Sequence, residues 1–454
     1  MPSAPQSNLI ATTPAQKRAL SYSTTIKMLF DEVLDTKMPA DRIVANYFRE
    51  HKKHGSKDRR VIRETLFGLF RWWGWLKQIG SQHDEQTWFA MLSSCALLEQ
   101  HMWRNFAEAW QHFAQLSPEQ LAVIDGHVEA TGEANTYTVI EKSLLLNNVF
   151  TGKTVKPSQL LPDWYWEVCP IESAEQQLKL VEAMSSRPPI WARVQKLATD
   201  KAVSQLQQDG IDASLCEYFG DAISLGSKSI NLNDVKLYKN GQVEIQDLAS
   251  QVIGNVCKPK ANEQWWDTCS GAGGKTLQLR SLMLQDVENN STGSITSSDI
   301  RTKALEELNK RAKRAGFDSI KIAKWKSDNL PVSENYFDGV LVDAPCSCTG
   351  TWRRNPDMRW IDDRSCVDDK PDLQLDILSR SAKAVKTGSH LVYATCSLSP
   401  LENEAVVDAF LSNNKDFSLV VSTHPFTGQQ NEHITVWPYE ANSDGMYVAK
   451  MVKK

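Results

Sequence analysis

The sequence lacks any apolar run that approaches the roughly 18–20 residues a membrane-spanning helix needs. Its first twenty residues also lack the apolar core of a secretory signal, so we expect a cytoplasmic protein. Nine cysteines in such a chain point to reduced thiols, because disulfides are rare in the cytosol. These absences exclude membrane-embedded and disulfide-stapled proteins.

A structural zinc site is not expected either. No two cysteines are spaced Cys-x-x-Cys, and Cys346-Ser-Cys348 has neither a second ligand pair nor a nearby histidine at zinc spacing. We therefore predict no resident metal.

The chain has little excess charge of either sign, with a formal net charge of -4. The segment from Asp41 to Lys77 departs from this balance, since its ten Lys or Arg and four acids give +6. It ends near Arg-Trp-Trp-Gly-Trp (71–75), which could stack bases beside a bound phosphate backbone. The alternative is a solvated helix whose tryptophans belong to the core.

Periodicity divides the 454 residues into three parts. Residues 1–160 carry apolar side chains at helical spacing, as in 24–34 and 59–76, and form a predicted helical region. Residues 161–245 form a small α/β unit, with a strand over 187–195, a helix over 199–210 and extended chain over 212–225. From 246 onward, short apolar strands alternate with helices, which predicts a parallel, doubly wound α/β sheet.

The predicted strands of this last part cover 264–270, 293–300, 320–325, 337–345, 390–397 and 446–452, and its helices 275–284, 301–316, 373–388 and 401–414. In such sheets ligands bind at the carboxyl ends of the strands. Asp299, Asp328, Asp343 and Cys396 all fall at or just past predicted strand ends. The site should lie there.

The segment Asp267 to Thr276, "DTCSGAGGKT", joins the first strand to a helix. It is not a P-loop, because Cys269 stands where that motif needs its first glycine, and it lacks the third glycine of a dinucleotide fingerprint. Its glycines still let the backbone pass close to a ligand. With Asp299 placed for ribose hydroxyls and Asp328 for an adenine amino group, the pattern fits S-adenosylmethionine better than NAD or ATP.

Cys346 follows the fourth predicted strand and Cys396 the fifth, on neighbouring loops. A buried cysteine is usually a core filler, but a pair on adjacent loops of the ligand-binding edge suits methylation at C5 of a pyrimidine. There a thiolate adds to C6 and makes C5 nucleophilic. A carboxyl such as Asp343 offsets the developing charge, and a second group removes the C5 proton. Lys275 and Arg353-Arg354 are candidates to favour the thiolate.

The motifs "DTCSGAGGKT", "DAPCS", "RRNPDMRW", "YATCS" and "DGMYVAK" resemble those of the RsmB/Sun family of RNA cytosine-C5 methyltransferases. The resemblance covers residues 246–454 and, more loosely, a NusB-like helical N-terminus. It implies a Rossmann-like class I methyltransferase sheet with S-adenosylmethionine as cofactor. It also implies that Cys396 is the nucleophile and that Cys346 assists product release.

Carried over position by position, the resemblance assigns cofactor and base contacts to Cys269, Ser270, Gly271, Gly273, Gly274, Lys275, Asp299, Arg301, Asp328 and Asp343. The loop departs from the family's Ala-Pro-Gly-Gly-Lys, since Gly271-Ala272 replaces Ala-Pro, which should loosen it. Cys348 stands where the family commonly has Ala or Gly, and we interpret it as structural.

The segment 351–360 contains Arg353 and Arg354, which we predict to reach RNA phosphates. Alternatively, this loop orients the catalytic face through pairing of Asp357. Ribosomal RNA is the expected substrate, transfer RNA the second choice, and the protein a monomer without membrane partners. The rival functions are an exocyclic-amine methyltransferase and a non-catalytic RNA-binding assembly factor.

Overall fold

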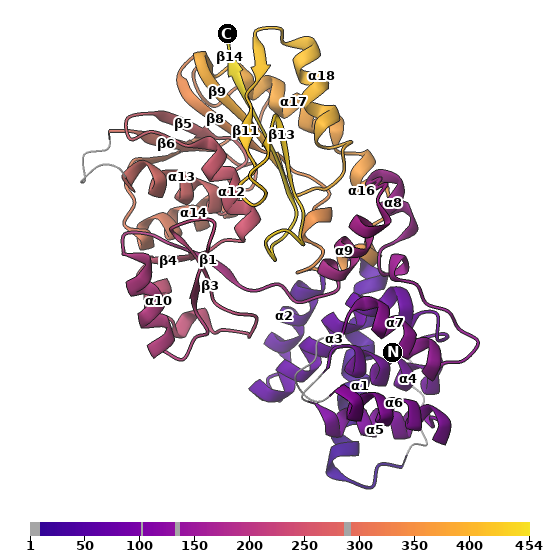
Figure 1. Cartoon of the computed structure of the whole chain (residues 1–454). Helices are drawn as coiled ribbons and strands as arrows, with labels where there is room; N and C mark the ends of the chain where they lie inside the picture. The colour runs from indigo at the N-terminus through magenta and orange to yellow at the C-terminus, as the bar shows by residue number, and fades with distance from the viewer. Residues whose placement is uncertain (1–9, 101–102, 132–136, 286–291) are drawn as a thin grey trace. The chain divides into compact units, whose positions relative to one another are not determined.

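The structure is a computed structural model that describes residues 10–100, 103–131, 137–285 and 292–454 (Figure 1). Contacts divide the chain into two compact units: residues 1–186 with 355–363, and residues 187–354 with 364–454. The predicted boundaries at 160 and 245 therefore each fall inside a unit. Residues 161–186 belong with the helices, and the remainder of the small α/β unit belongs with the large sheet.

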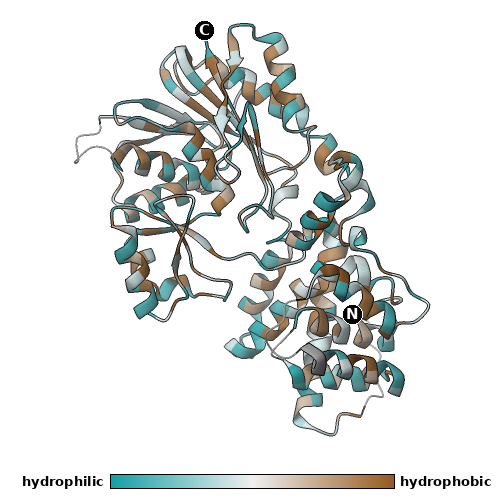
Figure 2. Ribbon diagram, viewed as in Figure 1, coloured by the Kyte–Doolittle hydropathy of each residue, from teal (hydrophilic) through white to brown (hydrophobic). Residues whose placement is uncertain are grey.

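The first unit is helical. Its elements are α1 (Pro14–Thr36), α2 (Ala40–Glu50), α3 (Ser56–Leu76), α4 (Glu85–Leu98), α5 (Arg104–Ala114), α6 (Pro118–Thr131), α7 (Val139–Val149), η1 (Pro157–Leu160), α8 (Asp163–Val168), α9 (Ala174–Met184) and α15 (Met358–Ile361). Most helices carry hydrophobic and hydrophilic residues side by side along their length (Figure 2), as amphipathic helices around a core should. None of the helices in the described ranges combines the length and hydropathy of a membrane span.

The tryptophans of segment 71–75 belong to the core of this unit. Trp72 and Trp75 are 1% and 0% exposed. Trp72 Nε1 and Arg71 Nη1 both donate to Glu99 Oε1, at 2.8 and 2.6 Å. The base-stacking interpretation of this segment is therefore wrong, while the basic side chains ahead of it, such as Lys52 and Arg63, stay exposed.

Gly74 in α3 marks the closest approach of η1 to this helix. A Cβ there would lie 1.7 Å from the carbonyl oxygen of Gln159. We expect Gly74→Ala to force η1 outward and to lower the free energy of unfolding by about 1–3 kcal/mol, the usual cost of overpacking. Chemical denaturation monitored by tryptophan fluorescence measures this change.

Gly126 in α6 provides the matched control. A Cβ there would meet no atom within 4 Å. Gly126→Ala should therefore raise stability by roughly 0.5–1 kcal/mol, because alanine is the better helix former. Equal stability of Gly74→Ala and wild type would contradict the packing of η1 on α3.

The second unit begins with a small antiparallel sheet of strand order β2-β3-β1-β4. Its elements are β1 (Trp191–Val194), α10 (Thr199–Gln208), β2 (Ser214–Leu215), β3 (Ala222–Ser224), η2 (Leu232–Asp234), α11 (Lys236–Lys239) and β4 (Val243–Ile245). Ala192, Leu206 and Ile223 are fully buried in its core.

The large sheet has eight strands in the order β10-β14-β9-β8-β5-β6-β7, with β13 also pairing with β14. The strands are β5 (Gln264–Asp267), β6 (Ser294–Ser297), β7 (Ile320–Ile322), β8 (Phe337–Asp343), β9 (Val385–Thr395), β10 (Phe417–Leu419), β13 (His433–Val436) and β14 (Met446–Lys453). The strands β7, β6, β5, β8 and β9 are parallel, and β14 runs antiparallel to β9. A separate pair, β11 (Ser422–Thr423) and β12 (Gln430–Asn431), completes the strands.

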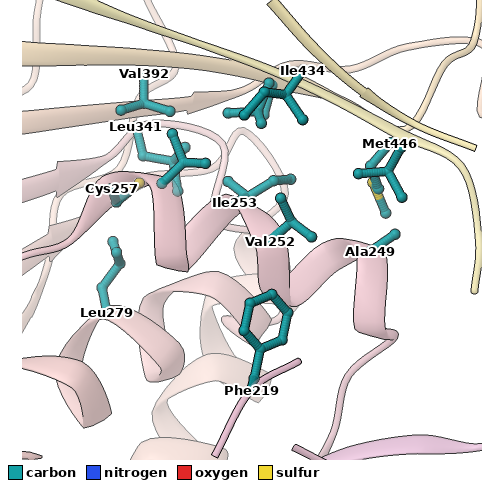
Figure 3. Packing of buried hydrophobic residues seen from close by; sticks show 14 of the residues in the cluster. Phe219, Ala249, Val252, Ile253, Cys257, Leu279, Leu341, Val392, Ile434 and Met446 are labelled. Carbon is teal, nitrogen blue, oxygen red and sulfur yellow. The ribbon is translucent and has the colours of Figure 1, made fainter. Parts of the chain in front are cut away.

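Helices cover both faces of this sheet (Figure 1). They are α12 (Leu248–Cys257), α13 (Gly274–Gln285), α14 (Thr302–Ala315), α17 (Pro371–Ala382) and α18 (Glu404–Asn413). The unit also contains the one-turn helix α16 (Ser365–Asp368) and the short turn η3 (Thr349–Thr351). Alternate residues of β8 face opposite ways: Leu341 packs with Val252 and Ile253 of α12 (Figure 3), and Val340 packs with the α17–α18 side. The predicted Rossmann-like fold is confirmed.

One predicted helix is too long. The helix expected over 373–388 ends at Ala382, and β9 starts at Val385, where it pairs with Phe337 of β8. Pairing of Val385 in the parallel ladder overrides the apolar spacing that extended the predicted helix.

The strand order fixes where a ligand binds. Chain order runs outward from β5 through β6 to β7 on one side and through β8 to β9 on the other, so β5 and β8 form the switch point. Ligands bind outside the carboxyl ends of the strands at such a point.

Candidate active site

Five segments meet at the carboxyl edge of the parallel strands. Asp267 ends β5, Asp299 follows β6, Asp343 ends β8 and Cys396 follows β9. The Cys346 loop continues directly from β8. The topology therefore brings side chains from distant parts of the sequence to one edge.

The glycine loop between β5 and α13 leaves open space beside it. Gly271 has φ +54°, a conformation that glycine adopts without strain, and a Cβ there would meet only Arg301 Nη2 at 3.6 Å. A Cβ on Gly274 would meet nothing within 4 Å. Gly273 differs, because its Cβ would lie 2.6 Å from Leu308 Cγ, so this glycine serves packing against α14.

The loop is tied to the end of β6. Ser270 N donates to Ser298 O at 2.8 Å, and Gly271 N donates to Asp299 Oδ2 at 2.9 Å. Arg301 binds both oxygens of Asp299 through Nε and Nη2, each at 3.0 Å. Burial alone would raise the pKa of Asp299, but the bonds from Arg301 outweigh it and hold the pKa below its usual value.

Asp267 and Cys269 lie deeper in the same loop. Burial raises the pKa of Asp267 to about 7 and that of Cys269 to about 12, so the thiol stays protonated. Asp267 Oδ2 accepts from Thr276 Oγ1 at 2.6 Å. Its buried Oδ1 has no hydrogen-bond partner among the residues that the structure describes.

Lys275 joins the glycine loop to β8. Its Nζ lies 2.7 Å from Asp343 Oδ2, and its side chain is only 12% exposed. Burial alone would lower the pKa of Lys275, but the carboxylate of Asp343 raises it on balance. Cys396 interacts electrostatically with this ammonium, although the pKa of Cys396 is raised on balance by its other neighbours.

Three cysteines converge beside this ion pair. Cys346 Sγ lies 3.2 Å from Cys396 Sγ, and Cys348 Sγ lies within 4.8 Å of both. All three are partly exposed. The two cysteines expected at the site are therefore neighbours, and a third, which we interpreted as structural, stands with them.

The three thiols shift one another's pKa values. Hydrogen bonds with Cys346 and Cys348, together with burial, raise the pKa of Cys396, and the bond with Cys348 raises that of Cys346 to about 12. Bonds from the other two sulfurs lower the pKa of Cys348. One thiolate in the cluster is thus stabilised by two thiols, whereas a second is disfavoured.

Glu402, which the sequence analysis missed, connects the two cysteine loops. Its Oε1 accepts from Ser347 N at 2.8 Å and from Gln374 Nε2 at 3.0 Å, and its Oε2 accepts from the hydroxyls of Ser347 and Ser397. Ser347 adjoins Cys346 and Ser397 adjoins Cys396. The only available signal was Glu402-Asn403 ahead of α18, and such a local pattern names no partner.

Glycines complete the connection between these loops. Gly350 N donates to Cys396 O at 2.9 Å, and Gly445 N donates to Gly350 O at 2.8 Å. A Cβ on Gly350 would lie 2.2 Å from Gly445 O. Gly445 belongs to the "DGMYVAK" segment, so that motif serves to seat the Cys346 loop.

Arg353 and Arg354 do not occupy the RNA-facing role predicted for them. Arg353 is 3% exposed and its Nη1 donates to Ser443 O at 3.2 Å. Arg354 bridges the buried carboxylates of Asp444, at 2.7 Å, and Asp247. That prediction is wrong, because both guanidinium groups are held by partners within their own unit.

The rest of this segment belongs to the helical unit, residues 355–363. Asp357 is 1% exposed, and its Oδ2 accepts from Ala40 N at 2.8 Å, which caps the start of α2. Trp360 Nε1 donates to Phe70 O at 2.7 Å. Asp357 is thus paired, but its partner is the start of α2 in the helical unit and not the catalytic face.

Asp328 lies apart from the others. Its side chain is fully exposed, and Arg380 Nη1 is 3.7 Å away. The structure does not bring this carboxylate onto the glycine loop, so its expected contact with adenine stays a prediction.

Two family models and several curated proteins are similar to this chain. Residues 255–452 match the model of the 16S rRNA methyltransferase RsmB/F family, and residues 161–231 match its RsmF/B-like ferredoxin-like domain. Ribosomal RNA small subunit methyltransferase B of Vibrio vulnificus strain YJ016 is 32% identical over 309 residues, 67% of this chain and 68% of the relative. The chain belongs to the RsmB/F methyltransferase family.

Solved structures share the fold. The protein PH0851 superposes with a TM-score of 0.71 at 22% identity, over 98% of this chain and 100% of its own. NSun6 from Pyrococcus horikoshii, solved with SFG, gives a TM-score of 0.55 at 18% identity, over 64% of this chain and 97% of its own.

S-adenosylmethionine is the cofactor of this RsmB/F protein. The residues at the carboxyl edge fit it: open space beside Gly271 and Gly274, a ribose-type acid at Asp299, and an unsatisfied buried oxygen on Asp267. A cationic sulfonium also suits an edge that carries three carboxyls, those of Asp267, Asp299 and Asp343.

Glu402 provides a test of how this site is held. Glu402→Ala removes the shared acceptor of Ser347 and Ser397, so the two cysteine loops should separate. We expect kcat to fall by about 10²-fold, the cost of displacing reacting groups by about 1 Å. The KM for S-adenosylmethionine should change little, because the glycine loop does not contact Glu402. Glu307→Ala, on the exposed side of α14, is the control.

Glu402 also makes stability depend on pH. Burial, and then the nearby Cys346, raise its pKa to about 7 from its ordinary value of 4.5. The folded state therefore binds a proton that the unfolded state has lost, and its stabilising contribution is complete below pH 4.5 and disappears as pH rises through 7. Relative to the non-titrating Glu402→Gln, wild type should lose up to roughly 3 kcal/mol between pH 5 and 8. A constant difference across this range would contradict the assignment.

Proposed function

We propose that this protein transfers a methyl group to C5 of a cytosine in ribosomal RNA through a covalent bond between Cys396 and C6. The observation that carries the proposal is the pair of sulfurs 3.2 Å apart beside Lys275 and Asp343, at the ligand-binding edge of a methyltransferase sheet. C5 of cytosine is a poor nucleophile, and a thiolate at C6 is the means of activating it.

The cofactor supplies an electrophilic methyl group on a sulfonium sulfur. Gly271 and Gly274 would pass close to it, and Asp299 would accept its ribose hydroxyls once Arg301, whose side chain is 69% exposed, turns toward solvent. Lys275 would hold Asp343 in place, as it does by the 2.7 Å contact. Asp343 would then face N3 and the amino group of the flipped cytosine.

The chemical step begins on Cys396. Its thiolate forms the S–C6 bond, and the electron pair of the C5–C6 double bond moves toward N3, where Asp343 offsets the developing charge. C5 would then bond to the methyl group as the bond between that methyl and the sulfonium sulfur breaks, its electron pair staying on the sulfur. Once the charge of Cys396 is spent in the S–C6 bond, Cys346 gives its proton to solvent, and its thiolate takes the C5 proton. The C5–C6 double bond re-forms, and the C6–S bond breaks to regenerate the Cys396 thiolate.

RNA would also be held by the helical unit. The exposed basic side chains on α2, on α3 and in the loop between them include Arg49, Lys52, Lys53, Arg60 and Arg63. Such a surface binds phosphates without reading sequence, so weak dependence of affinity on sequence and strong dependence on salt are expected.

The product identifies the reaction. Purified protein, S-adenosylmethionine with a labelled methyl group, and ribosomal RNA from cells lacking the gene are incubated together, and nucleosides are separated after complete digestion. We expect label in 5-methylcytidine. Label in N4-methylcytidine would favour an exocyclic-amine enzyme, and no label in RNA, with cofactor bound, would favour a non-catalytic assembly factor.

A further inference from the structure

The Cys346 and Cys396 loops contain one more sulfur than the proposed reaction uses. The Sγ atoms of Cys346, Cys348 and Cys396 all lie within 4.8 Å of one another. Each of the three residues is partly exposed.

The backbone at Cys348 explains how the third sulfur comes to lie there. Cys348 has φ 60° and ψ 21°, the left-handed conformation, which residues other than glycine rarely adopt. This turn places Cys348 Sγ 3.5 Å from Cys346 O. Ser347, between the two, instead binds Glu402. Both cysteines of the Cys-Ser-Cys segment therefore gather at Cys396.

We propose that these three thiolates bind one soft, thiophilic divalent cation of the zinc type. Zinc–sulfur bonds are about 2.3 Å, so three sulfurs around one ion lie about 3.8–4.0 Å apart. The 3.2 Å separation of Cys346 and Cys396 and the 4.8 Å limit for the cluster bracket this value. Small side-chain rotations suffice, and a water molecule completes the tetrahedron.

The chemistry of the ligands selects the ion. Each thiol gives its proton to solvent as its sulfur donates an electron pair to the cation. Three thiolates and a divalent ion leave one negative charge, close to the ammonium of Lys275, which interacts with Cys396. Mg²⁺ and Ca²⁺ prefer oxygen ligands and are not expected to bind.

Binding of the cation would inhibit methyl transfer. With its electron pair on the cation, Cys396 cannot add to C6; this consequence rests on the proposed function, whereas metal binding itself does not. Removal of the ion by a chelator would restore the thiolate, so the inhibition would be reversible.

Co²⁺ is a suitable spectroscopic probe, and Zn²⁺ then competes for the site. We expect full-length protein to bind one Co²⁺ with a thiolate-to-cobalt charge-transfer band that Zn²⁺ abolishes. Cys348→Gly removes one ligand and keeps the left-handed turn without strain. Since even indirect changes cost about 10–100-fold in metal affinity, losing this ligand should weaken binding about 100-fold or more. Cys216→Ala, at the residue that follows β2, should bind like wild type.

A second measurement needs no variant. Zn²⁺ should slow alkylation of Cys346, Cys348 and Cys396 together, as mapped by mass spectrometry, and a chelator should reverse the protection. Tight Co²⁺ binding by Cys348→Gly, or protection that omits these cysteines, would overturn the inference. Metal binding without any need for Cys396 in methyl transfer would refute the proposed function alone.

Discussion

Replacing Cys396 by alanine should lower methyl transfer to RNA by at least about 10⁴-fold, the scale of loss when a covalent nucleophile is removed. Without a sulfur at C6, C5 of cytosine cannot attack the methyl group. Cys396→Ser should be nearly as inactive, because a hydroxyl near Lys275 remains protonated. Transfer of labelled methyl groups to ribosomal RNA, measured in a single turnover, gives the rate of the chemical step.

The controls separate chemistry from folding. Cys396→Ala should bind S-adenosylmethionine as wild type does, because Cys396 lies on the loop after β9 and not on the glycine loop. Cys216→Ala, a partly exposed thiol of the same unit, should keep full activity. Methyl transfer by Cys396→Ala within tenfold of wild type would contradict the assignment.

Replacing Cys346 by alanine should block the reaction at a later step, after the covalent bond to RNA has formed. The bond between Cys396 Sγ and C6 can still form and the methyl group can still be transferred, but the C5 proton has lost its acceptor. Protein should then accumulate as a covalent adduct with RNA. Turnover should fall by about 10²–10⁴-fold, the usual contribution of a positioned base. A denaturing gel detects the adduct, and quenched-flow sampling should show one methyl group per protein followed by a stall.

The double variant controls this result. Cys346→Ala combined with Cys396→Ala should form no adduct, because the attacking sulfur is gone. An adduct in the double variant would assign the attack to another residue, and the nearby Cys348 would be the first to examine.

The fold was predictable because its signals are local. The continuous apolar run of β8 and the helical spacing of α14 each identify their element, and alternation of the two implies parallel strands. Proximity of the Cys346 and Cys396 loops then follows from topology, since neighbouring parallel strands end at one edge. The error over 373–388 arose where pairing of Val385 outweighed apolar spacing.

The residue roles that the sequence did not predict depend on partners that are remote in the sequence. Arg354 was expected to meet phosphates, but its carboxylates, Asp247 and Asp444, are 107 and 90 residues away. Glu402 reaches Ser347 across 55 residues. Cys348 lies beside the other sulfurs because of a left-handed turn, which the neighbouring residues in the sequence do not predict. Side-chain pairs of this kind follow from the packed structure and carry no local pattern.

The most direct test uses RNA in which the target cytosines carry fluorine at C5. Fluorine cannot leave as a proton does, so wild-type protein should stop at the covalent stage with its methyl group transferred. Protease digestion and mass spectrometry then identify the cross-linked peptide. We predict that the nucleotide is attached to Cys396; attachment to Cys346 or Cys348, or methyl transfer without any covalent bond, would contradict the mechanism.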